Sequence, residues 1–337
     1  AFKLEGDWLQ ARGTTLGADD GIGVALALGI LADAEIAHPP LEALFTVDEE
    51  TDMKGAKAVK PESLRGDTLI NLDAEDLNIA YISSAAGVSL KLELPLSRKP
   101  APVAVCKKII LEGLAGGHSG IEINRQRANA YVLLARFLSA AFATGIASLL
   151  HVFEQEKGHG ADNAIPDRAL AMIGLDSANK GEHLVPFVEK WEMVLRNEYR
   201  CSDPGVRLRI EDADPAAAPA PLAPASREAI LSLLRLIPLG VYRFSQTDEL
   251  IKTPYGEILV ETSCNLGIME MKESAVVLTL LARGSTNSVL DDLLERISAL
   301  TSLCGGSLKE TNRTPGWEMP KSPTRVRRLF QEQGLVC

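Results

Sequence analysis

The stretch Gly13-Thr14-Thr15-Leu16-Gly17-Ala18-Asp19-Asp20 is a turn that leads directly into an apolar helical run reaching about Ile36. Two runs typical of strands follow, Leu41–Val47 and Thr68–Leu72, with a short helix predicted between them at Met53–Val59. Because strands alternate with helices, we expect an α/β domain with a mostly parallel sheet and helices on both faces. The first helix is apolar on nearly every side, so we expect it to be buried.

Four carboxylates stand at the ends of these elements. Asp19 opens the helix, Glu49 and Glu50 follow the first strand, and Asp73 follows the second. In an open α/β sheet, ligands bind outside the carboxyl ends of the strands, so these acids should share one cleft. Carboxylates gathered there repel one another unless a divalent cation holds them together. One such acid alone is more often a solvated surface group, but the set favours metal-assisted hydrolysis.

Adjacent glutamates on an extended strand cannot face the same direction. For Glu49 and Glu50 the natural division is therefore one metal ligand and one general base. A base beside a metal-bound water can take its proton if it lies within hydrogen-bond reach.

The pattern changes near Gly87, after a third predicted strand at Asn78–Ser83. Alternation of apolar and polar residues at Ser89–Leu94 is typical of a half-exposed antiparallel strand. Antiparallel strands with helices to one side indicate an inserted α+β domain. We expect a catalytic α/β domain at 1–87, an inserted α+β lid and dimerisation domain at 88–313, and a return to the catalytic domain at 314–337. Further strands are predicted at Val105–Glu112, Ala147–Glu154, Arg168–Leu175, Val206–Ile210, Ile258–Met271 and Ser274–Arg283, and helices at Asn124–Ala143, Gly181–Asn197, Thr286–Leu303 and Pro323–Gln333.

The composition excludes several classes of partner. The chain has 337 residues, 46% of them apolar and 24% charged, with a net charge of −10. An acidic chain is poorly suited to nucleic acid or anionic membrane, because both bind basic surfaces. Five scattered cysteines without a Cys-x-x-Cys pair indicate free thiols in a reducing compartment, and we expect a cytoplasmic location. No signal peptide or membrane span is recognisable.

Three further features are weak when taken singly. The loop Gly116-Gly117-His118-Ser119-Gly120 could be a turn that needs positive φ, with an incidental surface histidine. Asn163-Ala164-Ile165-Pro166 could be a plain turn. Arg283 ends an apolar strand, where it is either a charge at the rim of the sheet or a clamp for a carboxylate.

Together, the motifs resemble those of the aminoacyl-histidine dipeptidases, the Xaa-His branch of the two-metal dipeptidase and deacylase superfamily that includes carnosinases. The likeness covers nearly the whole chain, and its first block is the most specific. The stretches that carry it are Arg12–Gly23, Thr46–Ala56, Ile70–Glu75, Leu114–Gly120, Asn163–Pro166, Val260–Gly267, Arg283 and Pro315–Trp317.

The resemblance implies a role for each candidate residue. Asp19 would bridge two metal ions, Glu50 and Asp73 would each bind one of them, and Glu49 would be the general base. His118 would polarise the scissile carbonyl across a homodimer formed by the lid, and Arg283 would hold the C-terminal carboxylate of a small peptide substrate. Asn163 would bind substrate as well. The implied metal is Zn²⁺, two ions per subunit, with Mn²⁺ or Co²⁺ as possible replacements.

The sequence departs from this family in its histidines. The family has a His-x-Asp motif before the first block and a histidine ligand near the C-terminus, and neither is found here. We expect that terminal segments, a first βα unit and a last strand, are missing from the sequence. Two alternatives stay open: an inactive or truncated member that acts as a dimeric binding or scaffold protein, and a related N-acyl amino acid deacylase.

Overall fold

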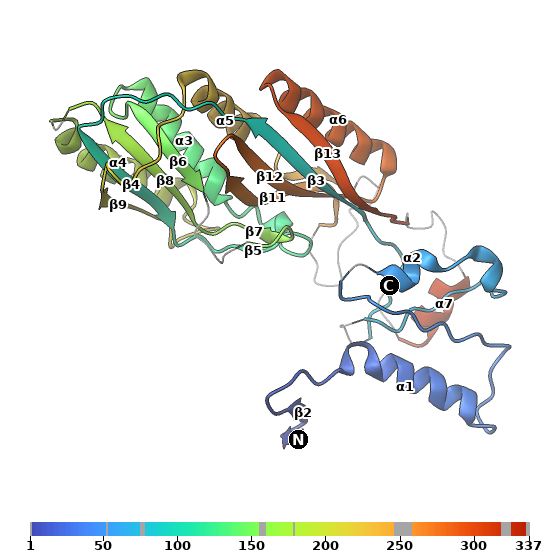
Figure 1. The fold of residues 1–337 in the computed structure, drawn as a ribbon. Helices are drawn as coiled ribbons and strands as arrows, with labels where there is room; N and C mark the ends of the chain where they lie inside the picture. Colours follow the sequence, from blue (N-terminus) through green and yellow to red (C-terminus); the bar gives the residue numbers. More distant parts are fainter. Residues whose placement is uncertain are drawn as a thin grey trace. The chain divides into compact units, whose positions relative to one another are not determined.

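The computed structural model describes residues 2–51, 53–74, 78–154, 160–177, 179–245, 258–317 and 325–334. The chain divides into two compact units, Ala1–Ile79 and Ala80–Cys337. We call them the first and the second unit and describe each by itself (Figure 1).

The first unit contains few regular elements. An antiparallel hairpin joins β1 (Phe2–Glu5) to β2 (Trp8–Ala11), and Gly6 turns it with a positive φ of 61°. Helix α1 spans Ala18–Ala32, and its N-cap, Gly17, adopts the left-handed conformation. The peptide bond between Asp19 and Asp20 is cis. A short helix α2 (Lys54–Ala58) and a 3₁₀ turn η1 (Pro61–Ser63) complete the unit.

The predicted strands of the first unit do not form in the described residues. Leu41–Val47, Thr68–Leu72 and Asn78–Ser83 contain no strand, and every strand pair in the described chain is antiparallel. A strand exists through its ladder hydrogen bonds, and within these three segments the described residues show only an isolated bridge residue, Ile79. The predicted parallel sheet is therefore not present among the described residues.

The prediction that α1 is buried is also wrong for the described structure. Gly23 is its only buried residue, whereas Ile22, Leu26 and Leu28 are each more than half exposed. Apolar residues on every side predict the helix correctly, but burial needs a second surface, and the described elements do not supply one.

The second unit is built around two antiparallel sheets. The first has five strands in the order β10-β11-β12-β3-β13, and helix α6 (Asn287–Leu303) packs against β12, β3 and β13 (Figure 1). The residues of β3 alternate between buried and more exposed, as the sequence predicted. The bounds of the five strands are Gly240–Phe244 (β10), Val260–Met271 (β11), Ala275–Gly284 (β12), Ala86–Pro95 (β3) and Ser307–Thr314 (β13).

The other sheet has four strands in the order β6-β8-β4-β9. Helix α3 (Ala130–Ala143) packs on β8 and β4, α4 (Asn179–Glu198) contacts β9, and α5 (Pro224–Leu236) contacts α3 and α6. Both sheets contribute to one continuous apolar core. The strands are Leu149–Glu154 (β6), Ala169–Leu175 (β8), Val105–Glu112 (β4) and Arg207–Ala213 (β9).

Four small elements are also described in the second unit. A two-residue ladder pairs β5 (Gly117–His118) with β7 (Ala164–Ile165), and a 3₁₀ turn η2 spans Ile123–Arg125. Helix α7 covers Arg325–Glu332; the first two residues of the helix predicted there, 323 and 324, lie outside the described residues.

The helical and strand predictions for the second unit are largely confirmed, with differences at the start of α3 and in several elements that were not predicted. Helix α3 begins at Ala130 and not at Asn124, because the side chain of Asn129 caps it by accepting a hydrogen bond from the backbone N–H of Tyr131. Helix α5 and strands β10 and β13 were not predicted. Strand β13 has no apolar pattern from which to predict it, because six of its eight residues are exposed.

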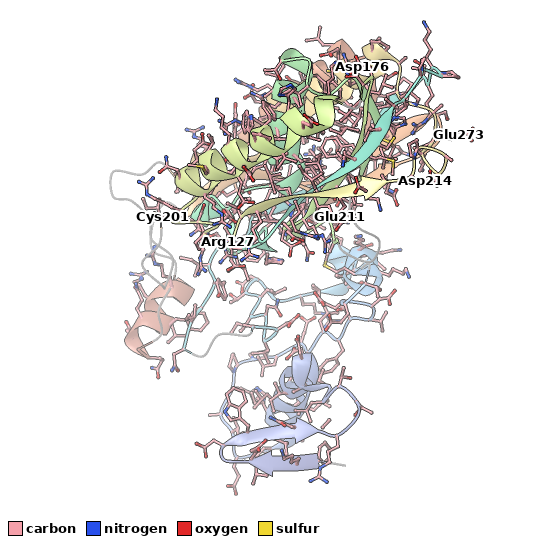
Figure 2. The ribbon with its side chains drawn as sticks, turned by 90° about the vertical axis from the view of Figure 1, so that its left-hand side faces the viewer. Arg127, Asp176, Cys201, Glu211, Asp214 and Glu273 are labelled. Carbon is pink, nitrogen blue, oxygen red and sulfur yellow. The ribbon has the colours of Figure 1, made fainter. Side chains whose placement is uncertain are left out.

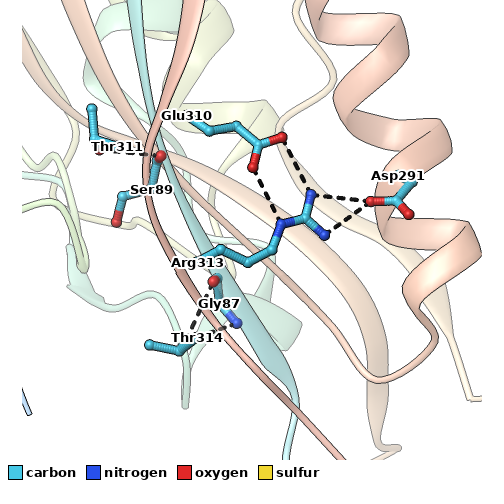
Figure 3. Close-up of polar contacts among 7 residues, drawn as sticks. All are labelled: Gly87, Ser89, Asp291, Glu310, Thr311, Arg313 and Thr314. Atoms are coloured by element: carbon cyan, nitrogen blue, oxygen red, sulfur yellow. Dashed lines mark hydrogen bonds and ion pairs between the residues drawn. The ribbon is translucent and has the colours of Figure 1, made fainter. Parts of the chain in front are cut away.

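Polar contacts hold β13 in place at the edge of its sheet. The guanidinium of Arg313 binds Glu310 of its own strand at 3.2 Å and Asp291 of α6 at 3.0 Å (Figure 3). The hydroxyl of Thr311 donates to the carbonyl of Ser89, so the strand is tied to β3 by side chains as well as by its ladder.

Candidate active site

Three of the predicted acids in the first unit influence one another. Partial desolvation raises the pKa of Asp73, and a hydrogen bond shared with Asp19 and the negative charges of Asp19, Glu49 and Asp20 raise it further. The arrangement therefore concentrates negative charge, which a proton or a cation must offset.

The described residues do not complete a metal centre. No group of three or more histidine, cysteine, aspartate or glutamate side chains within them is placed to hold an ion. Glu50 lies in an exposed turn and is not among the charges that act on Asp73. Two carboxylates are fewer ligands than a zinc site has, and such sites usually include nitrogen or sulfur. The donor set that comes together here does not by itself fit zinc.

In the second unit, the glycine-rich loop places His118 next to the segment that carries Asn163. His118 pairs with Ala164 in the β5–β7 ladder, and the backbone N–H of Ser119 donates to the carbonyl of Asn163 at 2.7 Å. Gly117 has a φ of 125°, which fulfils the expectation that this turn needs positive φ. A Cβ at Gly117 would also lie 2.3 Å from both Arg127 and Glu122, so only glycine leaves room for them.

Glu122 and Arg127 hold the backbone of this loop in place. The carboxylate of Glu122 accepts a hydrogen bond from the backbone N–H of His118 at 3.0 Å, which is the main reason that its pKa is lowered. Arg127, which is labelled in Figure 2, pairs with Glu122 at 2.9 Å and donates to the carbonyl of Gly116 at 2.6 Å. The backbone on both sides of Gly117 is thus held by one ion pair.

The imidazole of His118 has a defined hydrogen-bonding role. Its Nδ1 accepts from the backbone N–H of Gly120 at 3.2 Å. In a neutral imidazole the proton then resides on Nε2, which becomes the donor. A Cβ at Gly120 would lie 2.9 Å from Cε1 of His118 and 3.3 Å from Cζ of Arg283, so both side chains lie against this one glycine.

Arg283 is a half-buried cation on β12. Burial lowers the pKa of its guanidinium, and the negative charge of Asp162 opposes that shift in part. Its Nε is buried and has no hydrogen-bond partner among the described residues. The second unit therefore brings His118, Asn163 and Arg283 into one neighbourhood with a hydrogen-bond donor and an incompletely satisfied guanidinium.

Two supporting residues were not predicted from the sequence. The fully buried carboxylate of Asp203 accepts from the backbone N–H groups of Ala115 at 2.9 Å and Ala128 at 3.0 Å, and so clamps both ends of the segment that carries His118. The side chain of Asn265 donates to the carbonyl of Ala164 at 2.7 Å and holds the other strand of the small ladder. Asn265 stands in a quoted motif, Val260–Gly267, whereas nothing local distinguishes Asp203 from a loop aspartate.

The described residues form a mixed fold of helices and sheets that carries a polar cluster around His118, Asn163 and Arg283. The predicted resemblance to the aminoacyl-histidine dipeptidases is confirmed by one similar protein in sequence and one in fold. The chain is 36% identical over 330 residues to the cytosol non-specific dipeptidase of Escherichia coli strain K12, across 98% of this chain and 65% of that protein.

A solved structure gives the same result. The aminoacylhistidine dipeptidase from Vibrio alginolyticus matches with a TM-score of 0.84 at 30% identity, over 98% of this chain and 64% of that one. This match confirms the mixed α/β fold class. The chain spans slightly less than two thirds of the length of both relatives. No family model matches it.

None of the helices in the described part of the chain has the length and apolar content that a bilayer crossing requires.

Proposed function

We propose that this protein hydrolyses the peptide bond of dipeptides, with Xaa-His dipeptides as the preferred substrates. The observation that carries the proposal is that His118 and Arg283 both lie against Gly120, beside the segment of Asn163. A guanidinium suits a substrate carboxylate, and an imidazole N–H suits a carbonyl oxygen. The names of the two relatives, a non-specific dipeptidase and an aminoacylhistidine dipeptidase, support the same activity.

In this proposal each residue has one task. Arg283 binds the C-terminal carboxylate of the dipeptide, and Asn163 helps to fix the substrate backbone. His118 donates from Nε2 to the scissile carbonyl oxygen, where negative charge develops as water attacks. Glu49 takes the proton from the attacking water and delivers it to the leaving amine.

The requirement for a divalent metal is part of the proposal because the resemblance implies it, with Asp19, Glu50 and Asp73 as the expected ligands. Zinc, manganese or cobalt would be told apart by the metal content of the purified protein. We also propose a cytoplasmic location, by analogy with the cytosol dipeptidase of Escherichia coli.

We further propose a homodimer formed by the inserted lid domain, for which we retain the bounds 88–313. Strand β9 lies at one edge of the four-stranded sheet and β6 at the other, so each has an edge that a second copy could extend. Sedimentation at micromolar concentration should give a dimer, and a monomer would contradict this part of the proposal.

The activity test compares two substitutions in the first unit. Glu49→Gln keeps the size of the side chain but cannot accept a proton, so kcat for an Xaa-His dipeptide should fall by about 10²–10⁴. Glu62→Gln removes another exposed charge, in η1, and should leave kcat unchanged. Bound metal should be the same in both variants and should fall in Glu50→Gln.

Three results would change the proposal. Full activity in Glu49→Gln would overturn the choice of base. Hydrolysis of N-acyl amino acids in preference to dipeptides would favour a deacylase. Absence of hydrolysis with every divalent metal would favour a binding or scaffold protein.

A further inference from the structure

A buried carboxylate on β11 has no role in the function proposed so far. Glu261 is 7% exposed, and neither of its carboxylate oxygens has a hydrogen-bond partner among the described residues. It forms an ion pair with Arg243 on β10, at 3.5 Å from Nε to Oε2, without a hydrogen bond. A buried carboxylate normally accepts several hydrogen bonds, so an unsatisfied one requires an explanation.

The strand register shows which face of the sheet Glu261 occupies. Thr262 is paired with Gly284, and a Cβ on that glycine would lie 3.2 Å from Oγ1 of Thr262 and 3.1 Å from Cβ of Leu290 in α6. Thr262 therefore points toward α6. Successive side chains of a strand alternate, so Glu261 points to the opposite face.

Arg283 occupies that same face. It is paired directly with Ser263, which is two residues from Glu261, and no bulge interrupts this part of the ladder. Glu261 and Arg283 are thus diagonal neighbours, a relation in which the Cα atoms lie about 7–8 Å apart and long side chains reach one another's surroundings. Asn265 lies further along on this face and contacts the carbonyl of Ala164, which places the face against the segment of Asn163.

Unsatisfied polar atoms concentrate around this face. Nε of Arg283 and the hydroxyl of Ser119, which is 2% exposed and adjacent to His118, lack hydrogen-bond partners among the described residues, as does Glu261. Arg283 and Glu261 are a cation and an anion that both lack hydrogen bonds, and they lie one diagonal position apart. Together they are complementary to a ligand that carries both charges.

We propose that Glu261 is a specificity-determining residue that binds the cationic or N–H-donating side chain of the same substrate residue whose carboxylate Arg283 binds. This inference rests on the proposed function, because it takes Arg283 as the carboxylate clamp. It assigns the preference for histidine at the C-terminal position of the dipeptide to a charge-assisted hydrogen bond from the imidazole to Glu261. A leucine at that position would leave the buried carboxylate unsatisfied, which disfavours its binding.

Binding of N-acetyl-L-histidine and N-acetyl-L-leucine to the 337-residue chain tests this without any hydrolysis. Both ligands carry a carboxylate and lack a free amine, so they differ only in the side chain. By calorimetry, N-acetylhistidine should bind about tenfold more tightly, the factor that one hydrogen bond to a charged group typically gives. That preference should grow as the pH falls below about 6.5, where an imidazole becomes charged.

Two variants sharpen the test. Glu261→Gln should bind the two ligands equally, whereas Glu270→Gln, an exposed position on the same strand, should keep the full preference. An unchanged preference in Glu261→Gln would overturn the inference. So would an equal loss for both ligands, which indicates a structural role, or a wild-type chain that binds both alike or neither.

If Glu261→Gln does not fold, the pH dependence of the wild-type chain tests the inference by itself. A preference for N-acetylhistidine over N-acetylleucine that is independent of pH would overturn it. Hydrolysis assays separate the two proposals. A chain that shows the Glu261-dependent preference and hydrolyses nothing refutes the proposed activity alone, and an active dipeptidase without that preference refutes this inference alone.

Discussion

Apolar helices are exposed in the first unit of the chain and buried in the second. Among the described residues up to Ile79, Gly23 is the only buried one, although helix α1 consists almost entirely of small and aliphatic residues. In the second unit, α3 has eight buried residues and joins a core shared by both sheets. Apolar patterning therefore predicts that a helix forms, but a second packed surface decides whether the helix is buried.

The same contrast separates the strands. Strand β3 has a neighbour on each side and keeps its register against β12 over ten residues. Leu41–Val47 is as apolar but contains no strand. Local sequence was equivalent in the two cases, so the difference lies in non-local pairing.

The largest difference in stability between variants of the two units should come from truncating a side chain in the core of the second unit. Phe137 of α3 is fully buried and packs against Phe187 at 5.5 Å and Trp191 at 6.2 Å between ring centroids. Phe137→Ala should lower the free energy of unfolding by about 3–5 kcal/mol. Leu26→Ala in α1, where the side chain is 53% exposed, should change it by less than about 0.5 kcal/mol.

Urea unfolding followed by tryptophan fluorescence measures both variants, since Trp191 reports on the packing around Phe137. A comparable loss in Leu26→Ala would show that α1 is covered in solution, and would remove the contrast between the units.

The candidate site shows a similar limit to what sequence predicts. Loop motifs predicted His118, Asn163 and Arg283 as site residues, and the second unit brings them together. They could be predicted because glycine positions and strand ends are local signals in the sequence. The acids of the first unit were predicted from the ends of strands that do not form in the described residues. Asp203 could not be predicted, because its partners Ala115 and Ala128 are brought to it only by the fold.

The next largest loss of stability should come from substituting Asp203. This substitution tests whether buried hydrogen bonds hold the loop of the second unit that carries His118. Asp203→Ala leaves two backbone N–H groups without their acceptor, so unfolding should become easier by at least about 2 kcal/mol. Asp212→Ala, a mostly exposed aspartate on β9, is the matched control. Thermal denaturation of the two variants provides the measurement, and equal melting temperatures would contradict the clamp.

A smaller effect should appear at alkaline pH. Complete burial raises the pKa of the Cys264 thiol from 9.0 to about 12. The folded state therefore keeps its proton above pH 9, where the unfolded state loses it, so stability is full below about pH 9 and falls as the pH rises toward 12. At about pH 10, one unit above 9.0, the loss is about 1.4 kcal/mol.

Urea unfolding at neutral and alkaline pH, compared between wild type and Cys264→Ala, isolates this contribution. The variant should show a shallower alkaline decline, and identical slopes would refute it. Exposed Cys201, which is labelled in Figure 2, should react with a thiol reagent in the folded protein, whereas Cys264 should react only after unfolding.

The smallest effect should come from the polar edge of the second unit, where β13 resembles the first unit in its exposure. Arg313 joins Glu310 and Asp291, and its side chain is 40% exposed. Exposed ion pairs contribute about 0–1 kcal/mol, so Arg313→Ala should lower stability by no more than that. High salt should reduce the difference between variant and wild type, because it screens the pair. A loss as large as that of Phe137→Ala would mean that side-chain charges, and not the backbone ladder with β3, hold this edge strand in the sheet.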